Sequence, residues 1–367
     1  MIKEIVLETF LQESTPIYLG SKIWESVLPE KMNELKTDKY FLITDFNILN
    51  IYGQTLYNFL SKNYPVELIV LPAGEVNKNN MTCNYLIEEL FERNVTKSSV
   101  LIAFGGGVIG NIVGLAAALI FRGIRFFHIP ITFMSQTDSI LSRKQAINSM
   151  SGKNMIGSYY TPLFNFVDTS FLLSEPERLV RGALVETIKN GLIFNRNFFY
   201  EMKERINKGL VFNEENLFDL VKISILSKLP IIKNDPSEKA LGMILEYGHT
   251  TGHAIERLLK GKYSHGECVS IGMIIAARIS NKLGLLSHDE VEEHLDILQA
   301  LGTPTKVPDV LNSETIMRRM ELDNKKDIHG IRFVLLNEIG SCIEGPEHSY
   351  MVEVNPEIQK EAINESF

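Results

Sequence analysis

The segment SVLIAFGGGVIG, Ser99–Gly110, decides the fold. Its first half, Ser99–Phe104, is a short apolar run typical of a buried strand, and the glycines that follow open an apolar helix. Gly105, Gly107 and Gly110 fit G-x-G-x-x-G in the strand–turn–helix setting that this motif requires. Glycines let the backbone approach a pyrophosphate, and the helix N-terminus offers it unpaired N–H groups. The segment therefore predicts a dinucleotide site, with a tight turn that binds nothing as the alternative.

Strand-like and helix-like stretches alternate around this segment. Helical spacing is found in Asn80–Arg93 and Ile109–Phe121. Short apolar runs predict further strands at Tyr40–Thr44, Val66–Leu71, Arg125–Ile129 and Phe164–Val167. This alternation predicts a mostly parallel sheet covered by helices.

The pattern changes from about Glu175 onward. Ser174-Glu175-Pro176-Glu177 is a helix-start signal, with a Ser cap, an early Pro and acids in the first turn. Long amphipathic segments follow at Glu177–Phe194, Asn213–Ile232, Leu241–Leu259, His265–Leu283 and Asp289–Leu301, with a β-like return at Ile331–Leu336. We expect a dinucleotide-binding α/β domain over residues 1–172 and an all-helical metal- and substrate-binding domain over residues 173–367.

Composition excludes several classes of protein. The 367 residues suffice for about two domains, and the net charge of −8 at pH 7 shows no basic footprint for nucleic acid. Three cysteines at wide spacing form neither a disulfide framework nor a Cys-x-x-Cys pair. No leading segment resembles a signal peptide, and apolar runs such as Val113–Phe121 are too short to span a bilayer. We expect a cytoplasmic protein without nucleic-acid or membrane partners.

The adenosine end of the nucleotide needs polar residues at the same sheet edge. The usual acid about 20 residues after the glycine motif is not found. Asp45, at the end of the strand Tyr40–Thr44, could replace it. Asn47, and Glu75 and Lys78 in the loop after the next strand, are placed to complete the pocket.

Three of the eight histidines lie within residues 249–265. His249 and His253 are one helical turn apart, and His265 opens the next helical segment. Glu186 lies on an apolar face of Glu177–Phe194, where an unpaired carboxylate would be costly. These residues predict a divalent site with N and O ligands, suited to Zn²⁺, Co²⁺ or Mn²⁺. The alternative is that the histidines are ordinary core or surface residues.

Lysines, carboxamides and hydroxyls gather between the two predicted sites. They lie in Asp138–Asn148 and in Gly152-Lys153-Asn154, while Lys189 follows Glu186 by three residues and Lys228 precedes the histidines by one helix. Cations suit a phosphate dianion, and amides and hydroxyls suit sugar diols. The cluster predicts a small phosphorylated polyhydroxy substrate, with a solvated polar loop as the alternative.

Several motifs, in order along the chain, resemble the dehydroquinate synthase superfamily of sugar-phosphate cyclases. The resemblance runs from about Asp45 to Leu336 and implies an N-terminal Rossmann-like domain, a helical C-terminal domain, NAD and one divalent metal per chain, Zn²⁺ or Co²⁺. The motifs are Gly105-Gly106-Gly107-Val108, Phe121-Arg122-Gly123, Pro130-Ile131-Thr132, Asp138-Ser139, Gly152-Lys153-Asn154, Glu186-Thr187-Ile188-Lys189 and Gly248-His249-Thr250-Thr251-Gly252-His253-Ala254-Ile255-Glu256.

The resemblance also implies residue roles. Glu186, His249 and His265 would bind the metal, and His253 would instead face the substrate phosphate. Implied NAD contacts are Asp45, Asn47, Glu75, Lys78, Gly105, Gly106, Gly107, Gly110, Asn111, Thr132, Asp138, Lys153 and Thr169. Implied substrate contacts are Arg122, Asp138, Lys144, Lys153, Asn154, Lys189, Lys228, Glu246, His253 and Lys325, with Lys144 and Glu246 as catalytic residues. A homodimer is implied as well, in which Arg122 could serve the neighbouring subunit.

Two departures from the family pattern bear on the substrate. Dehydroquinate synthases typically carry an Arg that grips the substrate carboxylate and, four residues later, an Asn. These positions are Gly242 and Glu246 here. A carboxylate beside Glu246 without a guanidinium would be repelled. We therefore expect a substrate without a carboxylate, as in the subfamily that converts D-glucose 6-phosphate to a deoxy-inosose.

The implied reaction is a cyclisation with loss of phosphate. NAD⁺ would oxidise C4 transiently, phosphate would be eliminated, the hydride would return, and the opened ring would close by an aldol step. The enzyme would thus be a carbon–oxygen lyase. The alternatives are a dehydroquinate synthase or seven-carbon sugar-phosphate cyclase, a polyol dehydrogenase of the glycerol dehydrogenase type, and a non-enzymatic partner subunit.

Overall fold

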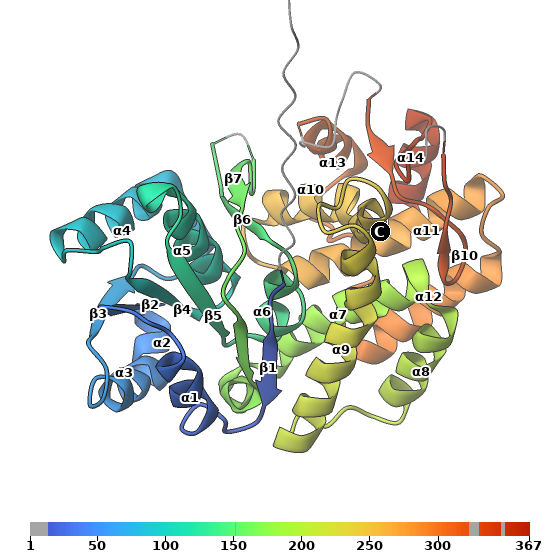
Figure 1. Cartoon of the computed structure of the whole chain (residues 1–367). Helices are drawn as coiled ribbons and strands as arrows, with labels where there is room; N and C mark the ends of the chain where they lie inside the picture. Colours follow the sequence, from blue (N-terminus) through green and yellow to red (C-terminus); the bar gives the residue numbers. More distant parts are fainter. Residues whose placement is uncertain (1–13, 151, 323–329, 346–348) are drawn as a thin grey trace, which may run out of the picture.

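The computed structural model describes residues 14–150, 152–322, 330–345 and 349–367. Its N-terminal half is built on a six-stranded sheet in which every neighbouring pair of strands is parallel (Figure 1). In spatial order the strands are β1 (Ile17–Gly20), β8 (Asn165–Asp168), β5 (Arg125–Pro130), β4 (Val100–Gly105), β2 (Tyr40–Asp45) and β3 (Val66–Leu71). The five predicted strands are confirmed within one residue at each end, and β1 was not predicted.

Alternate residues of β2 explain the layers on the two faces of the sheet. Phe41 and Ile43 pack in one core with α4 (Asn80–Glu92) and α5 (Gly107–Leu119). Tyr40 and Leu42 pack in the opposite core with α1 (Val27–Asn33) and α3 (Gln54–Leu60). A parallel sheet covered on both faces needs apolar residues at successive positions, which is why its strands are continuous apolar runs.

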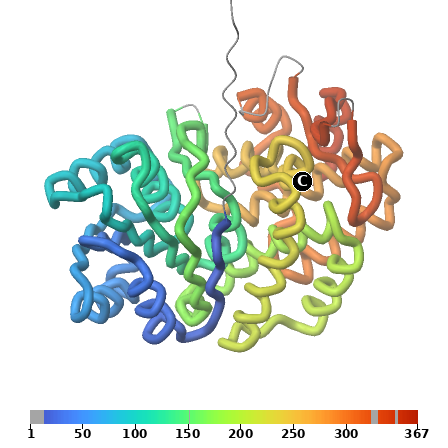
Figure 2. Tube along the Cα trace, in the orientation of Figure 1, coloured from blue at the N-terminus to red at the C-terminus, as the bar shows by residue number. Residues whose placement is uncertain are grey.

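A hairpin lies between the two halves of the chain (Figures 1 and 2). Its strands β6 (Lys144–Ile147) and β7 (Ile156–Tyr159) pair antiparallel. Gly114 of α5 leaves room for this hairpin, because a Cβ there would lie 2.1 Å from Oε1 of Gln145. The residue pattern of this region predicted only a polar cluster, not a hairpin.

The C-terminal half is helical, which confirms the predicted architecture. Its helices are α7 (Glu177–Phe194), α8 (Arg196–Asn207), α9 (Glu214–Asn234), α10 (His249–Leu259), α11 (His265–Lys282), α12 (His288–Leu301), α13 (Ser313–Met320) and α14 (Pro356–Asn364). Two small antiparallel ladders join them, so this half is not entirely helical: β9 (Arg332–Phe333) with β12 (Val352–Glu353), and β10 (Leu336–Glu338) with β11 (Ser341–Cys342). Among the described residues, no helix is both long and apolar enough to cross a membrane.

Two local predictions in this half are wrong. Leu241–Leu259 is not one helix, because a 3-10 turn (Leu241–Glu246) ends before Gly248, whose φ is +77°. The chain turns there against α11, where a Cβ on Gly248 would lie 2.6 Å from Cγ of Met273. Ser174 does not cap α7, since its hydroxyl donates to the Phe171 carbonyl.

Candidate active site

The glycine turn forms one wall of a small pocket at the carboxyl end of the sheet. Gly106 precedes α5 and offers no side-chain cap, so the first N–H groups of that helix have no side-chain acceptor from it. A Cβ on Gly107 would lie 3.2 Å from the Ser139 hydroxyl, and one on Gly110 would lie 3.2 Å from the His128 ring. The pocket is lined by Gly105, Gly106, Gly107, Gly110, Asn111, His128, Pro130, Ser135, Ser139, Ile140 and Gln145. This arrangement can hold a phosphate group against the helix N-terminus.

The residues predicted for the adenosine end lie at the same sheet edge. Asp45 ends β2, next to β4 in the sheet, and its carboxylate accepts from the backbone N–H groups of Asn47 and Ile48 at 2.9 and 3.1 Å. Lys78 is buried and donates to the side-chain oxygen of Asn154 at 2.6 Å. Glu75 is exposed and accepts from the Asn148 amide at 2.8 Å.

Three other predicted cofactor residues have structural partners. Thr132 caps α6 (Phe133–Thr137) by accepting from the Ser135 N–H. Asn111 accepts from the backbone N–H of Ala146 at 3.1 Å, which ties α5 to β6. Thr169 is fully buried, and its hydroxyl donates to the Gly20 carbonyl at 3.3 Å.

Glu186, His249 and His265 meet although they come from three different helices. Oε1 of Glu186 lies 3.5 Å from Nε2 of His249 and 3.5 Å from Nε2 of His265. Two ligand atoms that are each about 2.0–2.1 Å from a tetrahedral Zn²⁺ stand roughly 3.3–3.4 Å apart. Oε1 is buried and has no hydrogen-bond partner among the residues that the structure describes, as is expected for a ligand atom aimed at a cation. These residues fit a divalent metal.

The second nitrogen of each imidazole is held by an acceptor. Nδ1 of His249 lies 3.1 Å from the Tyr247 carbonyl oxygen, and Nδ1 of His265 lies 3.3 Å from Oε2 of Glu256. Acceptors at Nδ1 favour the tautomer with its proton there, which leaves the Nε2 lone pair facing Glu186. Both rings are thus oriented as metal ligands.

The charges around Glu186 favour its anionic form. Burial alone would raise its pKa, but the Lys189 ammonium, which donates to Oε2, and the two histidines hold that pKa well below its usual range. Burial would likewise lower the pKa of His265, yet Glu186 and Glu256 on either side raise it to about 10. The space between these carboxylates therefore favours a positive charge.

His253 belongs to the same cluster. His249, His253 and His265 each offer a ligand atom within 4.8 Å of the others, so proximity alone would also admit His253 as a ligand. His249 and His265 each have a nitrogen 3.5 Å from Oε1 of Glu186. Glu186, His249 and His265 stay the predicted ligand set, with His253 beside them.

The predicted substrate lysines are paired with carboxylates in the same region. Lys228 contacts Asp138 at 2.6 Å, Lys153 contacts Glu256 at 2.5 Å, and Lys144 contacts Glu238 at 2.5 Å. Together with Lys189–Glu186, these form four ion pairs, which we call the lysine–carboxylate pairs. Two of these pairs lie beside the histidines, because Glu186 and Glu256 both contact His265, while binding of phosphate and sugar by the lysines stays a prediction.

Sequence reasoning missed Glu238 and Glu256. Glu238 lies in a polar loop that looks solvated in sequence, yet only 9% of its side chain is exposed and its φ is +53°. Its Cβ and Cγ lie 2.9 Å from where a Cβ on Gly242 would stand. Glu256 ends the histidine motif, and that position was its only sequence signal. His128, fully buried behind Gly110, was also missed, and burial lowers its pKa to about 4.

The remaining predicted residues have different surroundings. Glu246 is half-buried between two residues that serve the site, since the Leu245 carbonyl accepts from Lys189 at 2.6 Å and the Tyr247 carbonyl lies beside His249. Arg122 is exposed at the end of the 3-10 turn (Ile120–Arg122) that follows α5, in the left-handed region at φ +65°. Lys325 lies outside the described residues.

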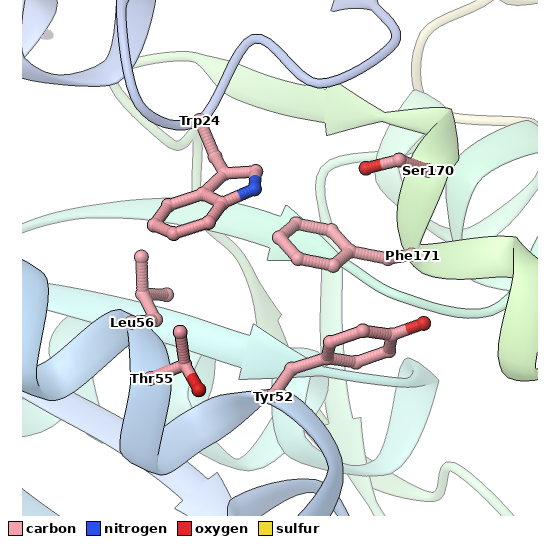
Figure 3. A pocket seen from close by; sticks show the side chains of 6 residues that line it. All are labelled: Trp24, Tyr52, Thr55, Leu56, Ser170 and Phe171. Carbon is pink, nitrogen blue, oxygen red and sulfur yellow. The ribbon is translucent and has the colours of Figure 1, made fainter.

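A second pocket is apolar and lacks charged groups. It is lined by Trp24, Tyr52, Thr55, Leu56, Ser170 and Phe171, whose aromatic rings surround it in Figure 3. Tyr52 and Phe171 meet edge to face at 5.0 Å. We therefore assign the chemistry to the histidine and lysine–carboxylate region.

Comparison with known proteins identifies the family of the chain. The family models for the 3-dehydroquinate synthase N-terminal and C-terminal regions match residues 68–182 and 183–326. The chain belongs to the dehydroquinate synthase family of sugar-phosphate cyclases, enzymes that act as carbon–oxygen lyases on phosphates.

Individual relatives divide between two activities. A 2-deoxy-scyllo-inosose synthase of Micromonospora echinospora is 35% identical over 311 residues, which are 85% of this chain and 78% of that protein. A 3-dehydroquinate synthase of Thermoanaerobacter pseudethanolicus is 36% identical over 333 residues, 90% of this chain and 93% of that protein. A crystal structure of 2-deoxy-scyllo-inosose synthase with carbaglucose-6-phosphate, NAD⁺ and Co²⁺ has a TM-score of 0.87 at 32% identity, and covers 96% of both chains.

Proposed function

We propose that this protein is a 2-deoxy-scyllo-inosose synthase, which cyclises D-glucose 6-phosphate with loss of phosphate. This product is the carbocycle from which aminoglycoside antibiotics are built. We assign residues 1–172 to NAD binding and residues 173–367 to the metal and substrate.

The observation that carries this proposal is that the Glu238 side chain lies against Gly242. Gly242 stands where dehydroquinate synthases typically carry an Arg for the substrate carboxylate. The space beside Gly242 is occupied by the Glu238 side chain, since an added Cβ would approach it to 2.9 Å. The Gly242 N–H donates to Asp235 at 2.9 Å, which holds this backbone in place. With glycine in place of that Arg, position 242 offers a substrate carboxylate no guanidinium and has the Glu238 carboxylate beside it, whereas neutral hydroxyls can donate to Glu238.

The proposed roles follow from position and charge. When bound, NAD would accept and return a hydride, and the divalent ion on Glu186, His249 and His265 would act as a Lewis acid. Lys144 is held by Glu238, so this pair can orient a sugar hydroxyl and move its proton. Glu246 would accept a second hydroxyl proton or hydrogen bond.

The phosphate would be held by cations at the hairpin and α10. Lys153 and Asn154 at the hairpin tip and His253 on α10 offer charge-assisted donors to its oxygens. The Asp138–Lys228 pair would hold the remaining sugar hydroxyls. Lys189 would hold the Glu186 carboxylate, the proposed metal ligand, in position. We also propose a homodimer in which Arg122, exposed in the turn after α5, reaches the phosphate bound by the partner subunit.

The second candidate is 3-dehydroquinate synthase, which the 36% identity to the Thermoanaerobacter protein favours. Purified protein with Co²⁺ or Zn²⁺ and substoichiometric NAD⁺ should be given either D-glucose 6-phosphate or the dehydroquinate precursor. Faster phosphate release from glucose 6-phosphate, without accumulating NADH, supports the proposal. Faster turnover of the dehydroquinate precursor would replace it with the second candidate, and stoichiometric NADH would indicate a dehydrogenase.

A further inference from the structure

The two carboxylate oxygens of Glu256 contact two different parts of the molecule. Oε2 lies 3.3 Å from Nδ1 of His265, and Oε1 lies 2.5 Å from Nζ of Lys153. Its side chain is only 11% exposed, so water competes little for either oxygen. Glu256 is therefore a direct link between a metal-binding imidazole and the tip of the β6–β7 hairpin.

The hairpin tip is also tied to the nucleotide-binding half. Asn154, next to Lys153, accepts from Lys78 at 2.6 Å, and Asn148 donates to Glu75 at 2.8 Å. Glu75 itself lies 3.7 Å from Lys153. The tip thus has contacts to both halves, and Lys153 faces one carboxylate from each.

The base of the hairpin repeats this two-sided arrangement. Ala146 donates its N–H to Asn111 of α5, and Tyr159 donates its hydroxyl to the Ser237 carbonyl at 3.0 Å. Lys144 is paired with Glu238 in the same loop as Ser237. The hairpin therefore lies between the proposed nucleotide and metal regions, as Figure 1 shows.

We propose that Glu256 is a positioning residue that couples metal binding at His265 to the docking of the β6–β7 hairpin through Lys153. This inference rests on the proposed metal site. A metal on Nε2 fixes the imidazole ring, and its Nδ1–H then fixes the Glu256 carboxylate. The fixed carboxylate holds Lys153 in one place, and with it the hairpin.

The coupling must act in both directions. If the metal and NAD⁺ both stabilise the docked hairpin, then each must tighten the binding of the other by the same factor. NAD⁺ is the available probe, because the tip contacts Glu75 and Lys78 of the proposed nucleotide site. In the wild type, saturating NAD⁺ should lower the Kd for Co²⁺ by about fivefold or more.

The experiment is amide hydrogen exchange of the full chain, with and without saturating Zn²⁺. In the wild type, Zn²⁺ should slow exchange in peptides covering residues 144–159 by about fivefold or more. Glu256→Gln keeps an acceptor for His265 but removes the charge that holds Lys153. It should weaken Zn²⁺ binding by about 10- to 100-fold, and at saturating Zn²⁺ the hairpin should no longer respond.

Two further variants test whether the hairpin response depends on the contact between Glu256 and Lys153. Lys153→Met should abolish the hairpin response while leaving Zn²⁺ affinity within about twofold of the wild type, because the contact to His265 remains. Glu292→Gln, at an exposed acid on α12 that contacts neither Lys153 nor the hairpin tip in the contacts described above, is the control and should keep the whole response. A variant that binds Zn²⁺ and responds like the wild type after loss of Glu256 would overturn the proposal.

The same data distinguish failure of the coupling from failure of the proposed function. If wild-type protein binds no divalent metal, the metal site itself is wrong. If it binds Zn²⁺ in a His265-dependent way and exchange in residues 144–159 does not change, only the coupling is wrong.

Discussion

The Lys144 ammonium and the Glu238 carboxylate form an ion pair at 2.5 Å, although the two residues come from different halves of the chain. Lys144 is on the hairpin, and Glu238 lies in the loop before the histidine helix. The pair closes one side of the site, beside the space left by Gly242. It depends on a left-handed backbone at Glu238, which a non-glycine residue adopts only when its surroundings hold it there.

We expect Glu238→Gln to lower kcat by about 100-fold or more, because the amide cannot take a proton from a hydroxyl or hold Lys144 electrostatically. Metal content should not change, since the ion pair described for Glu238 is with Lys144 and not with a proposed metal ligand. Steady-state kinetics of phosphate release would measure the effect. Lys239→Met, at the exposed neighbouring residue, is the control and should be near wild type. Equal losses in both variants would mean that only the loop fold matters.

Removal of a metal ligand should remove the metal. His249→Ala and His265→Ala each delete one of three protein donors, and we expect both to lose bound Zn²⁺ or Co²⁺ and almost all activity. Metal analysis of the purified variants is the measurement. His288→Ala, at a histidine whose side chain is 78% exposed, should retain the metal. Full metal content in both ligand variants would rule out this site.

Glu246→Gln should slow turnover and leave metal content intact. A hydrogen bond to a charged group is worth about 1.5–3 kcal/mol, so we expect kcat/KM for glucose 6-phosphate to fall by about 10- to 100-fold. Kinetics and metal analysis on the same preparation test both statements. An unchanged kcat/KM would remove Glu246 from the substrate site.

Glu175 should make stability depend on pH. Burial raises its pKa to about 7, opposed by the Phe133 N–H that donates to its carboxylate at 2.6 Å. The folded state thus holds this proton more tightly than the unfolded state, whose pKa is about 4.5. Its stabilising contribution is complete below about pH 4.5 and is lost as pH rises to about 7.

Glu175→Gln keeps an acceptor for Phe133 and cannot ionise. Its Tm relative to the wild type should therefore rise between about pH 5 and pH 8. Glu177→Gln, at an exposed acid two residues away, should show no such trend. A constant difference between Glu175→Gln and wild type would show that Glu175 has an ordinary pKa.

Local sequence patterns predicted the helices and strands whose bounds depend only on the residues within the segment. Val66–Leu71 and Glu177–Phe194 were predicted with the bounds that the structure has, because apolar runs and helical spacing are set by burial of each segment. The break at Gly248 was not predicted, because its left-handed φ depends on packing against Met273 in another helix. The hairpin was missed because β7 is exposed along its whole length and lacks an apolar pattern.

The site residues also divide into those that a local pattern indicates and those that only the fold brings together. His249 and His253 were recognisable from their spacing, and Glu186 from its charge on an apolar helix face. Glu238 could not be found this way, because its role depends on a loop that folds back onto Lys144. Pairings between residues about 100 positions apart, such as Lys153 with Glu256, leave no trace in spacing or composition.

The lysine–carboxylate pairs have a consequence for how fast a substrate arrives. Each of these lysines already has an anion beside it, so an incoming phosphate exchanges one ionic partner for another. Neutral pairs produce a field that falls off steeply with distance, and the chain as a whole carries −8. Association should therefore gain little from long-range steering, and its rate should depend only weakly on ionic strength. The attraction would act at contact, once the phosphate is already among these side chains.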